Sequence, residues 1–187
     1  MSKKIAIIGG SGALGAGLAK RWAKAGHQVV VGSRDAGRAV EAAVRLNQEA
    51  GTSTITGAGN PEAAAASEIV VLTVPYANQM PTLEAIAAAL DGKILVDVTV
   101  PLVPPKVRTV QVPEGGSCAK AAQDKLGAGV RVVSAFQNVA ATHLDDLDHA
   151  IDCDVLVCGN DPAAREEIVQ LAGDADMKAW HAGVIAN

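Results

Sequence analysis

The sequence predicts an α/β fold in which helices cover both faces of a mainly parallel sheet. Short apolar runs with the length of buried strands alternate along the chain with segments of helical periodicity, as in parallel sheets. Hydrophobic residues make up 49% of the chain and aromatic residues only 2%, so the core must consist of Val, Ile, Leu and Ala. We expect one domain that spans residues 1–187.

The first strand is expected at Ile5–Ile8, and a glycine cluster follows it directly. Gly10, Gly12 and Gly15 have the spacing of a dinucleotide-binding turn. In that motif the first glycine permits the tight turn, the second lets backbone approach a pyrophosphate, and the third lets helix and strand pack closely. This context predicts a doubly wound sheet of the Rossmann type. The residues expected around the pyrophosphate are Gly10, Ser11, Gly12, Ala13, Leu14 and Gly15.

The second strand, His27–Gly32, is expected to end beside the adenosine ribose of the bound dinucleotide. Proteins that prefer NAD carry an acidic residue there, whereas this chain has Gly32 with Ser33 and Arg34 behind it. A hydroxyl and a guanidinium bind a 2′-phosphate through charge-assisted hydrogen bonds, so NADP is the expected cofactor. Arg38, one helical turn further on, would add positive charge.

A helix is expected directly after this strand. We interpret Asp35 as the acidic residue at its N-terminus, with a displaced ribose ligand as the alternative. The side chains that share one face of this helix are Val40, Ala43, Val44 and Asn47.

The next two strands are expected at Thr54–Thr56 and Ile69–Pro75, joined by a small helix that begins at Asn60. The carboxyl end of the second of these strands should lie beside the glycine turn, at the switch point of the sheet. Backbone at that end is well placed to cover the nicotinamide ribose. The residues added to the cofactor site are therefore Thr73, Val74 and Pro75.

The alternation continues with strands at Lys93–Asp97 and Val130–Ser134. The proline-rich stretch 98–116 between them cannot be a central strand, and we interpret it as a loop over the cofactor site, because long loops in compact domains are usually functional. The segment 136–140 follows the second of these strands at its carboxyl end, where ligands bind in such sheets.

The last strands are expected at Asp154–Gly159 and Lys178–Ala182, with Asp161 capping the helix between them. The alternation of strands and helices requires parallel strands with right-handed crossovers. His143 and His149 lie six residues apart and off one helical face, so no metal site is expected.

The composition argues against several classes of partner. The net charge is −4 without a basic block, and aromatic residues are few, so nucleic acid is not an expected partner. No apolar stretch of about 18 residues exists, so nothing is expected to span a membrane. The N-terminus lacks a signal-peptide core, and three cysteines without C-x-x-C spacing indicate free thiols in a reducing compartment, so we expect a cytoplasmic protein.

Seven segments share their pattern with one enzyme family. They are Gly9–Ala19, Gly26–His27, Val30–Arg34, Leu72–Pro75, Val133–Phe136, Asp154–Gly159 and Ala182–Gly183. In these segments, which extend over nearly the whole chain, the sequence resembles the deazaflavin-dependent NADP oxidoreductases, also known as NADPH:coenzyme F-420 reductases. The Gly32-Ser33-Arg34 piece is the more specific part of the resemblance, because many families share the glycine motif.

The resemblance implies hydride transfer between NADP(H) and a small-molecule deazaflavin, coenzyme F-420, in a cytoplasmic enzyme that is often a homodimer. It also implies that Ser33 and Arg34 contact the 2′-phosphate and that segments 73–75 and 137–140 surround the nicotinamide and the deazaflavin. Because the two ring systems carry the chemistry, no acid–base side chain is expected. Gln137 and Asn138 are the expected positioning residues of the reaction, and Val139 and Ala140 complete the cofactor site.

The chain departs from the family pattern at two places. Gln137 stands where a histidine is expected beside the deazaflavin, and the usual C-terminal helix that helps to pair subunits is absent from the sequence. Two alternatives therefore stay open. One is an NADPH-dependent reductase of a flavin, a ferric chelate or a quinone, and the other is an NADP-sensing binding protein without turnover.

Overall fold

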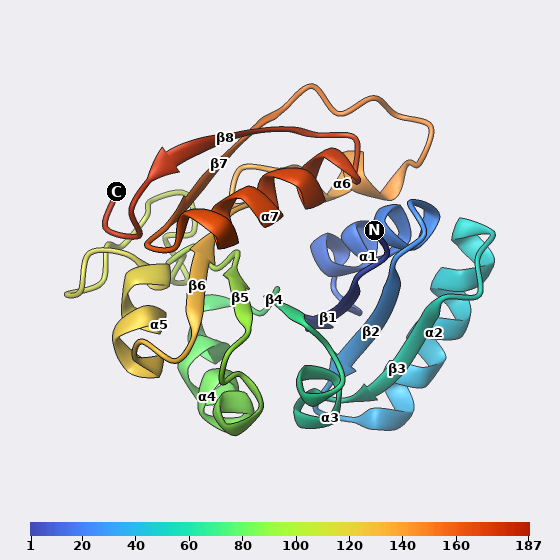
Figure 1. Ribbon diagram of the computed structural model, residues 1–187, viewed down its shortest axis with the longest axis horizontal. Coiled ribbons are helices and arrows are strands. Elements are labelled where there is room, and N and C mark those ends of the chain that lie inside the picture. The colour runs from blue at the N-terminus through green and yellow to red at the C-terminus, as the bar shows by residue number, and fades with distance from the viewer.

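The computed structural model describes residues 1–187 as an eight-stranded sheet flanked by helices, with the strand order β3-β2-β1-β4-β5-β6-β7-β8 (Figure 1). The order reverses between β1 and β4, which confirms the doubly wound, Rossmann-type α/β class predicted from the sequence. The strands are β1 (Lys4–Ile8), β2 (Gln28–Ser33), β3 (Ile55–Gly59), β4 (Ile69–Leu72), β5 (Ile94–Asp97), β6 (Arg131–Ser134), β7 (Asp154–Gly159) and β8 (Lys178–Gly183). The helices are α1 (Ala13–Lys24), α2 (Ala36–Ala50), α3 (Asn60–Ala65), α4 (Tyr76–Ile86) with the short 3-10 turn η1 (Ala87–Ala89), α5 (Cys118–Leu126), α6 (Ala141–Asp145) and α7 (Pro162–Gly173).

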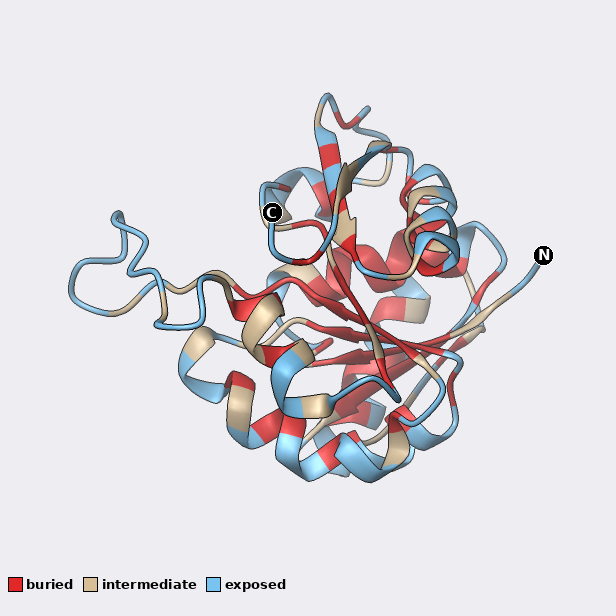
Figure 2. Ribbon diagram, turned by 60° about the vertical axis from the view of Figure 1, so that its left-hand side comes forward, coloured by how far each residue is buried: buried red, intermediate tan, exposed pale blue.

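Successive residues of the central strands face two different helix layers. Ile5 and Ile7 of β1 pack into a cluster with the apolar faces of α1, α2 and α7. Ala6 and Ile8 pack on the other side of the sheet, with α3, α4 and α5. Figure 2 shows the central strands as a buried band with exposed helix surfaces outside it. Both faces of the parallel strands are thus covered, which explains their continuous apolar runs.

The last two strands do not run in the expected direction. β6 pairs with β7 in antiparallel register, with Ser134 opposite Cys158, and β7 then pairs with β8 in parallel. The expectation that all strands are parallel was therefore wrong at the β6–β7 pair. The reason lies in the connection: its one helix, the five-residue α6, packs on α1 and is too short to carry a crossover along the sheet.

The predicted face of α2 was also wrong in part. Val40 and Val44 are 50% and 54% exposed, whereas the buried side chains of this helix are Ala39, Ala42, Ala43 and Leu46. A Cβ atom added at Gly57 of β3 would overlap the backbone of Ala39. This close approach of helix and strand selects an alanine stripe for the core face, so the valines point to solvent.

Candidate functional site at the switch point

A cavity of about 250 Å³ lies where the strand order reverses, at the carboxyl ends of the central strands. It is the place where open α/β sheets bind their ligands. The residues that line it are Gly9, Ser11, Gly12, Ser33, Arg34, Asn60, Thr73, Val74, Pro75, Asn78 and Thr82. Three separate predictions from the sequence, the glycine turn, the Ser33-Arg34 pair and segment 73–75, thus meet in one cavity.

The structural roles of Gly9 and Gly10 in the turn differ from those expected from the sequence. The positive φ of the tight turn, +83°, belongs to Gly9 and not to Gly10. Gly10 is needed for packing instead, because a Cβ there would lie 2.8 Å from the carbonyl oxygen of Ile7 and 3.2 Å from a methyl group of Val31. The tight-turn role that we assigned to Gly10 is therefore corrected to its neighbour.

Gly15 and Gly12 have the surroundings that the motif requires. A Cβ added at Gly15 would lie 2.7 Å from Cα of Gly10 and 2.8 Å from Oγ1 of Thr73, so this glycine brings helix and strand into contact. A Cβ added at Gly12 would meet only the carbonyl oxygen of Gly9, at 3.3 Å. Gly12 therefore leaves its space open on the side of the cavity, where a pyrophosphate can approach the backbone.

The N-terminus of α1 is free to bind an anion. Its N-cap residue is Gly12, and no side chain accepts a hydrogen bond from its first turn, whereas Asp35 and Asp161 cap α2 and α7. The N–H groups of the first turn, which include those of Ala13 and Leu14, have no partners within the helix. Together with the positive end of the helix dipole, they provide the donors that a phosphate needs.

Thr73 ties the segment after β4 to the glycine turn. Its backbone N–H and its hydroxyl both donate to the carbonyl oxygen of Ile8, each at 2.9 Å. Strand β4 ends at Leu72, so Thr73, Val74 and Pro75 lie in the loop that leads into α4. These contacts hold the loop against the cavity.

Ser33 and Arg34 enter the cavity from the end of β2. The guanidinium of Arg34 makes no hydrogen bond or ion pair within the chain, although neighbouring Arg38 contacts Asp35 at 3.8 Å. Asp35 accepts a hydrogen bond from the backbone N–H of Arg38 at 3.2 Å, which confirms our interpretation of Asp35 as a helix cap. Arg38 itself has an 82% exposed side chain and is not among the residues that line the cavity, so its expected place beside the 2′-phosphate stays a prediction.

Four residues of the cavity were missed in the sequence analysis, namely Gly9, Asn60, Asn78 and Thr82. Asn78 and Thr82 lie one turn apart on α4, so they share the helix face beside segment 73–75. Their spacing of four residues in a helix at the switch point was the available signal. Asn60 follows β3 directly and is only 7% exposed. Its burial could not be inferred from its place at the start of a helix.

The segment 136–140 lies at the same edge of the sheet but outside the cavity. Nε2 of Gln137 donates to the backbone oxygen of Asp97 and to Oγ of Ser134, both at 2.8 Å. Nδ2 of Asn138 donates to the backbone oxygen of Asp154 at 2.9 Å, so this side chain is held against β7. Val139 is buried and Ala140 is exposed, and neither lines the cavity.

Phe136 holds this segment in place with strained backbone. It is fully buried, has a φ of +70°, and packs edge-on against Trp22 with ring centroids 5.9 Å apart. A bulky residue in the left-handed region is unfavourable by about 1–3 kcal/mol and persists only where its surroundings demand it. The aromatic contact thus sets the path of residues 137–140.

A buried carboxyl group stands between the two parts of the site. Asp97, at the end of β5, is fully buried and pairs in register with Leu72 and Ser134. Its carboxyl oxygens accept hydrogen bonds from Nε2 of Gln79 and from the backbone N–H of Thr99. Burial raises the pKa of the Asp97 carboxyl, and these hydrogen bonds oppose that rise.

Cys118 belongs to the same buried cluster. Its backbone oxygen accepts a second hydrogen bond from Nε2 of Gln79, at 3.0 Å. Burial, with a smaller contribution from the Asp97 charge, raises the pKa of its thiol to about 11. The thiol therefore stays protonated near neutral pH and is a poor nucleophile. Oε1 of Gln79 and Oγ1 of Thr99 are buried without a partner.

The proline-rich loop does not cover the cavity. None of residues 98–116 lines it, and the loop, which contains an isolated bridge between Leu102 and Val110, extends from the left edge of the molecule (Figure 1). The expectation of a lid over the cofactor site was therefore wrong in this conformation. Exposed valines such as Val112, with 69% of its surface accessible, show that the loop packs weakly on the domain.

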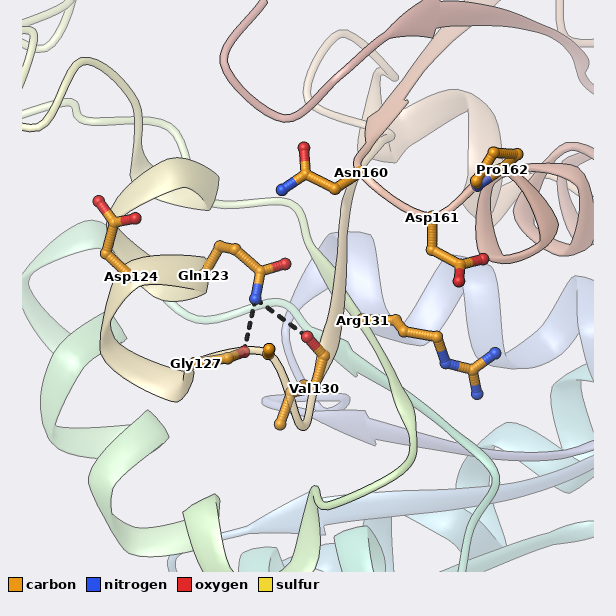
Figure 3. Close-up of a pocket in the computed structure, with 9 residues that line it drawn as sticks. Gln123, Asp124, Gly127, Val130, Arg131, Asn160, Asp161 and Pro162 are labelled. Atoms are coloured by element: carbon orange, nitrogen blue, oxygen red, sulfur yellow. Dashed lines mark hydrogen bonds between the residues drawn. The ribbon is translucent and has the colours of Figure 1, made fainter.

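A second cavity, of about 580 Å³, lies at the opposite end of β6 from segment 136–140 (Figure 3). Arg131, Asp124, Asn160 and Asp161 are among its lining residues, and none of the residues predicted for the site is. Gln123 spans its floor with hydrogen bonds to the backbone oxygens of Gly127 and Val130. It lies away from the carboxyl ends of the parallel strands, so the smaller cavity is the better cofactor site despite its size.

Other kinds of site have little support in the structure. No group of three or more His, Cys, Asp and Glu side chains gathers where it could hold a metal ion. His143 and His149 stack with ring centroids 4.5 Å apart, and the carbonyl oxygens of both residues accept hydrogen bonds from Arg21. None of the helices has the length and apolar character needed to cross a membrane.

Comparisons with known proteins point to one family. A family model described as NADP oxidoreductase, coenzyme F-420-dependent, matches residues 4–101. An F-420-dependent NADP reductase from Methanothermobacter thermautotrophicus is 41% identical over 100% of this chain and 84% of its own length. The F-420-dependent NADP reductase from Methanocaldococcus jannaschii is also 41% identical, over 92% of this chain and 80% of its own length.

Solved structures agree with these relatives. A protein from Arthrobacter, described as an F-420-dependent NADP reductase, superposes with a TM-score of 0.83 at 28% identity, covering 98% of this chain and 86% of the other. A protein from Sinorhizobium meliloti has a TM-score of 0.80 at 21% identity over 100% of this chain and 87% of the other, and it shares the fold.

Proposed function

We infer that this chain, which belongs to the family of coenzyme F-420-dependent NADP oxidoreductases, transfers a hydride between NADP(H) and coenzyme F-420. The observation that carries the cofactor half of this inference is the switch-point cavity. There the uncapped N-terminus of α1 and the unpaired guanidinium of Arg34 line one side of the same space. An anion-binding helix end and a free cation, one strand apart, fit the pyrophosphate and the 2′-phosphate of NADP.

The residues around the cavity fit NADP in detail. We propose that Ser11, Gly12 and the first-turn amides of Ala13, Leu14 and Gly15 hold the pyrophosphate. Ser33 and Arg34 hold the 2′-phosphate, and segment 73–75 covers the nicotinamide ribose, with Asn78 and Thr82 beside it. Thr73 supports this arrangement, because its hydroxyl donates to the carbonyl oxygen of Ile8 at the end of β1 and so ties segment 73–75 to the strand that leads into the glycine turn.

Hydride transfer requires the protein to position the two rings and does not require a side chain that transfers a proton. The nicotinamide and the deazaflavin supply the hydride-transfer chemistry when both are bound. The chain contributes a rigid edge of the sheet, on which the ends of β4, β5 and β6 lie side by side. We propose that segment 137–140 flanks the acceptor there, with Gln137 and Asn138 fixing the path of its backbone, and with Val139 and Ala140 beside the rings. Close, oriented contact of the two rings accounts for the catalysis.

We also propose that the enzyme acts in the cytoplasm as a homodimer. Its three cysteines are free thiols, which favours a reducing compartment. The outer face of β7 and β8 carries Leu156 and Trp180, which pair in register and are 59% and 57% exposed, with Val184 close behind at 51%. Such an apolar face supports contact with a second copy. Its molar mass in solution, measured by light scattering, tests the homodimer.

The reaction is tested by the oxidation of NADPH under anaerobic conditions with different acceptors. We expect turnover with coenzyme F-420 and much less with FMN, ferric chelates or quinones. Preferential turnover with one of those acceptors would replace the deazaflavin in this proposal. Binding of NADPH without turnover of any acceptor would indicate an NADP-sensing protein instead.

A further inference from the structure

Asn60 occupies a junction between two cavities. It lines the switch-point cavity of about 250 Å³ and a neighbouring one of about 430 Å³, and Ser33 and Arg34 line both as well. The second cavity continues along Ala36 and the start of α3. A dinucleotide with its pyrophosphate at the glycine turn and its 2′-phosphate at Arg34 has its adenosine ribose at this junction.

The side chain of Asn60 has no structural partner that explains its burial. The residue is only 7% exposed, its carboxamide makes no hydrogen bond within the chain, and Oδ1 is completely buried. A buried amide without a partner is unfavourable by about 1–3 kcal/mol. In native proteins such groups commonly have a ligand or a water molecule as partner. Asn47, on the other side of β3, illustrates the ordinary case, because its carboxamide bonds to the backbone of Ile55 in both directions.

Asn60 also fills the space that an acidic residue needs in NAD-binding proteins. A Cβ atom added at Gly32 would lie 3.0 Å from Oδ1 of Asn60 and 2.7 Å from Cδ1 of Ile8. Position 32 therefore cannot carry a carboxylate unless Asn60 moves. Its carboxamide stands where that carboxylate would otherwise meet the ribose.

We propose that Asn60 hydrogen-bonds the 3′-hydroxyl of the adenosine ribose of NADP and thereby contributes to the choice of NADP over NAD. A carboxylate at this place accepts from both ribose hydroxyls but repels a 2′-phosphate. A carboxamide is neutral and can both donate and accept, so it pairs with the remaining 3′-hydroxyl without opposing the phosphate. Ser33 and Arg34 then serve the phosphate alone. The proposal rests on the inferred use of NADP but not on the identity of the hydride acceptor.

Calorimetric binding of nucleotide fragments tests the contact without any turnover. The probes are adenosine 2′,5′-bisphosphate and its 3′-deoxy analogue, and the proteins are the wild type and Asn60→Ala. We expect Asn60→Ala to weaken binding of the first probe about fivefold, the effect of one neutral hydrogen bond. The 3′-deoxy analogue should bind both proteins equally. An equal loss for both probes would overturn the proposal, as would no loss for either.

Two further variants separate recognition from folding. Asn47→Ala removes an asparagine that bonds only to backbone and Thr52, so it should lower the melting temperature and affect both probes alike. Asn60→Asp should weaken NADP⁺ and strengthen NAD⁺, so that the ratio of the two affinities falls at least tenfold. An unchanged ratio in a folded Asn60→Asp protein would refute a role in selectivity. Failure of wild-type protein to bind adenosine 2′,5′-bisphosphate would refute the NADP assignment itself, which makes the two failures distinguishable.

Discussion

The glycine turn and the segment 136–140 lie at the same edge of the sheet, but they differ in how many of their polar groups are already bonded. At the turn, the first amides of α1 have no side-chain cap and Arg34 has no partner. In the segment, the side-chain amides of Gln137 and Asn138 donate hydrogen bonds to the backbone of β5 and β7. We therefore propose that the turn binds a charged ligand, whereas the segment uses its polar side chains to hold its own backbone.

This difference predicts where substitutions act. Changes at Gly12 and at Arg34 should alter the affinity for the cofactor with little effect on folding, because a Cβ at Gly12 meets little protein and the Arg34 side chain makes no hydrogen bond or ion pair within the chain. Changes around Asp97 and Gln137 should alter stability first, because the Asp97 carboxyl is bonded to Gln79 of α4 and the Gln137 side chain is bonded to the backbone of β5. Four substitutions, taken from the largest expected effect to the smallest, test this division.

The substitution Gly12→Val should weaken NADPH binding by about a hundredfold while the protein stays folded. A branched side chain meets little protein there, since only the oxygen of Gly9 lies near its Cβ, at 3.3 Å. It would instead occupy the place of the pyrophosphate, and overlap of this kind is unfavourable by about 3 kcal/mol. Fluorescence titration with NADPH and thermal unfolding measure the two properties separately.

The matched control for this variant is Gly15→Val. A Cβ at Gly15 would collide with Cα of Gly10 at 2.7 Å, so this substitution should lower the melting temperature strongly. Normal affinity in a folded Gly12→Val protein would contradict the placement of the phosphates. A large loss of stability in Gly12→Val would contradict the division between ligand binding and support of the backbone.

The substitution Arg34→Ala should weaken NADPH binding by about ten- to a hundredfold and leave NADH binding unchanged. The wild-type protein should prefer NADPH by at least about tenfold, since a charged hydrogen bond to the 2′-phosphate contributes about 1.5–3 kcal/mol. Arg38→Ala is the control, because Arg38 is exposed and paired with Asp35. It should lower the affinity for NADPH less than about twofold. Equal binding of NADPH and NADH by the wild type would refute the assignment.

The substitution Asp97→Asn should change how stability depends on pH. Burial raises the pKa of this carboxyl in the folded protein above its ordinary value of 3.8, so the folded state binds the proton more tightly than the unfolded state. The stabilisation is complete at pH values below the unfolded pKa and is lost as the pH rises through the folded pKa. The wild type should therefore lose melting temperature relative to the variant as the pH rises from about 4 through neutral pH.

Melting curves of both proteins across that range measure this effect. The loss of the hydrogen bond to Gln79 in the variant shifts its stability by the same amount at every pH, so only the slope reports on ionisation. A constant difference between the two melting temperatures would mean that Asp97 does not titrate abnormally.

The features that could be predicted from the sequence depend on neighbouring residues, whereas those that could not depend on residues far apart in the chain. The glycine spacing, the cap at Asp161 and the pair Ser33-Arg34 depend on adjacent residues and elementary chemistry, and each is found where the sequence places it. By contrast, Asn138 donates to the backbone of a residue 16 positions away, and Gln137 donates to the backbone of a residue 40 positions away as well as to nearby Ser134. No local pattern contains those contacts.

The antiparallel direction of β7 and the burial of Asn60 both depend on contacts with residues that are distant in the sequence. The first depends on a connection whose only helix packs on α1, far from it in sequence. The second depends on the empty space above Gly32, in the neighbouring strand. The sequence indicates only that Gly32 replaces the acidic residue of NAD-binding proteins, and the structure adds that the Asn60 side chain lies close above this glycine.

The smallest expected effect belongs to Gln137, the residue at which the resemblance led us to expect a histidine. Its Nε2 group is tied to Asp97 and Ser134, so Gln137→Ala should reduce the free energy of unfolding by about 1 kcal/mol and leave NADPH binding unchanged. If the rest of the carboxamide also faces the acceptor, the KM for coenzyme F-420 should rise by a few fold.

Because an amide does not ionise, turnover of the wild type should show no step from this position between about pH 6 and pH 8. Gln137→His should introduce such a pH-dependent step in turnover. A change in acceptor kinetics in Gln137→His that differs from the change in Gln137→Ala would indicate contact with the acceptor, whereas a loss of stability alone would indicate support of the loop. If both variants turn over coenzyme F-420 like the wild type at every pH, Gln137 only supports the loop. Ligand contacts would then come from the glycine turn and Arg34 and not from the side chain of Gln137.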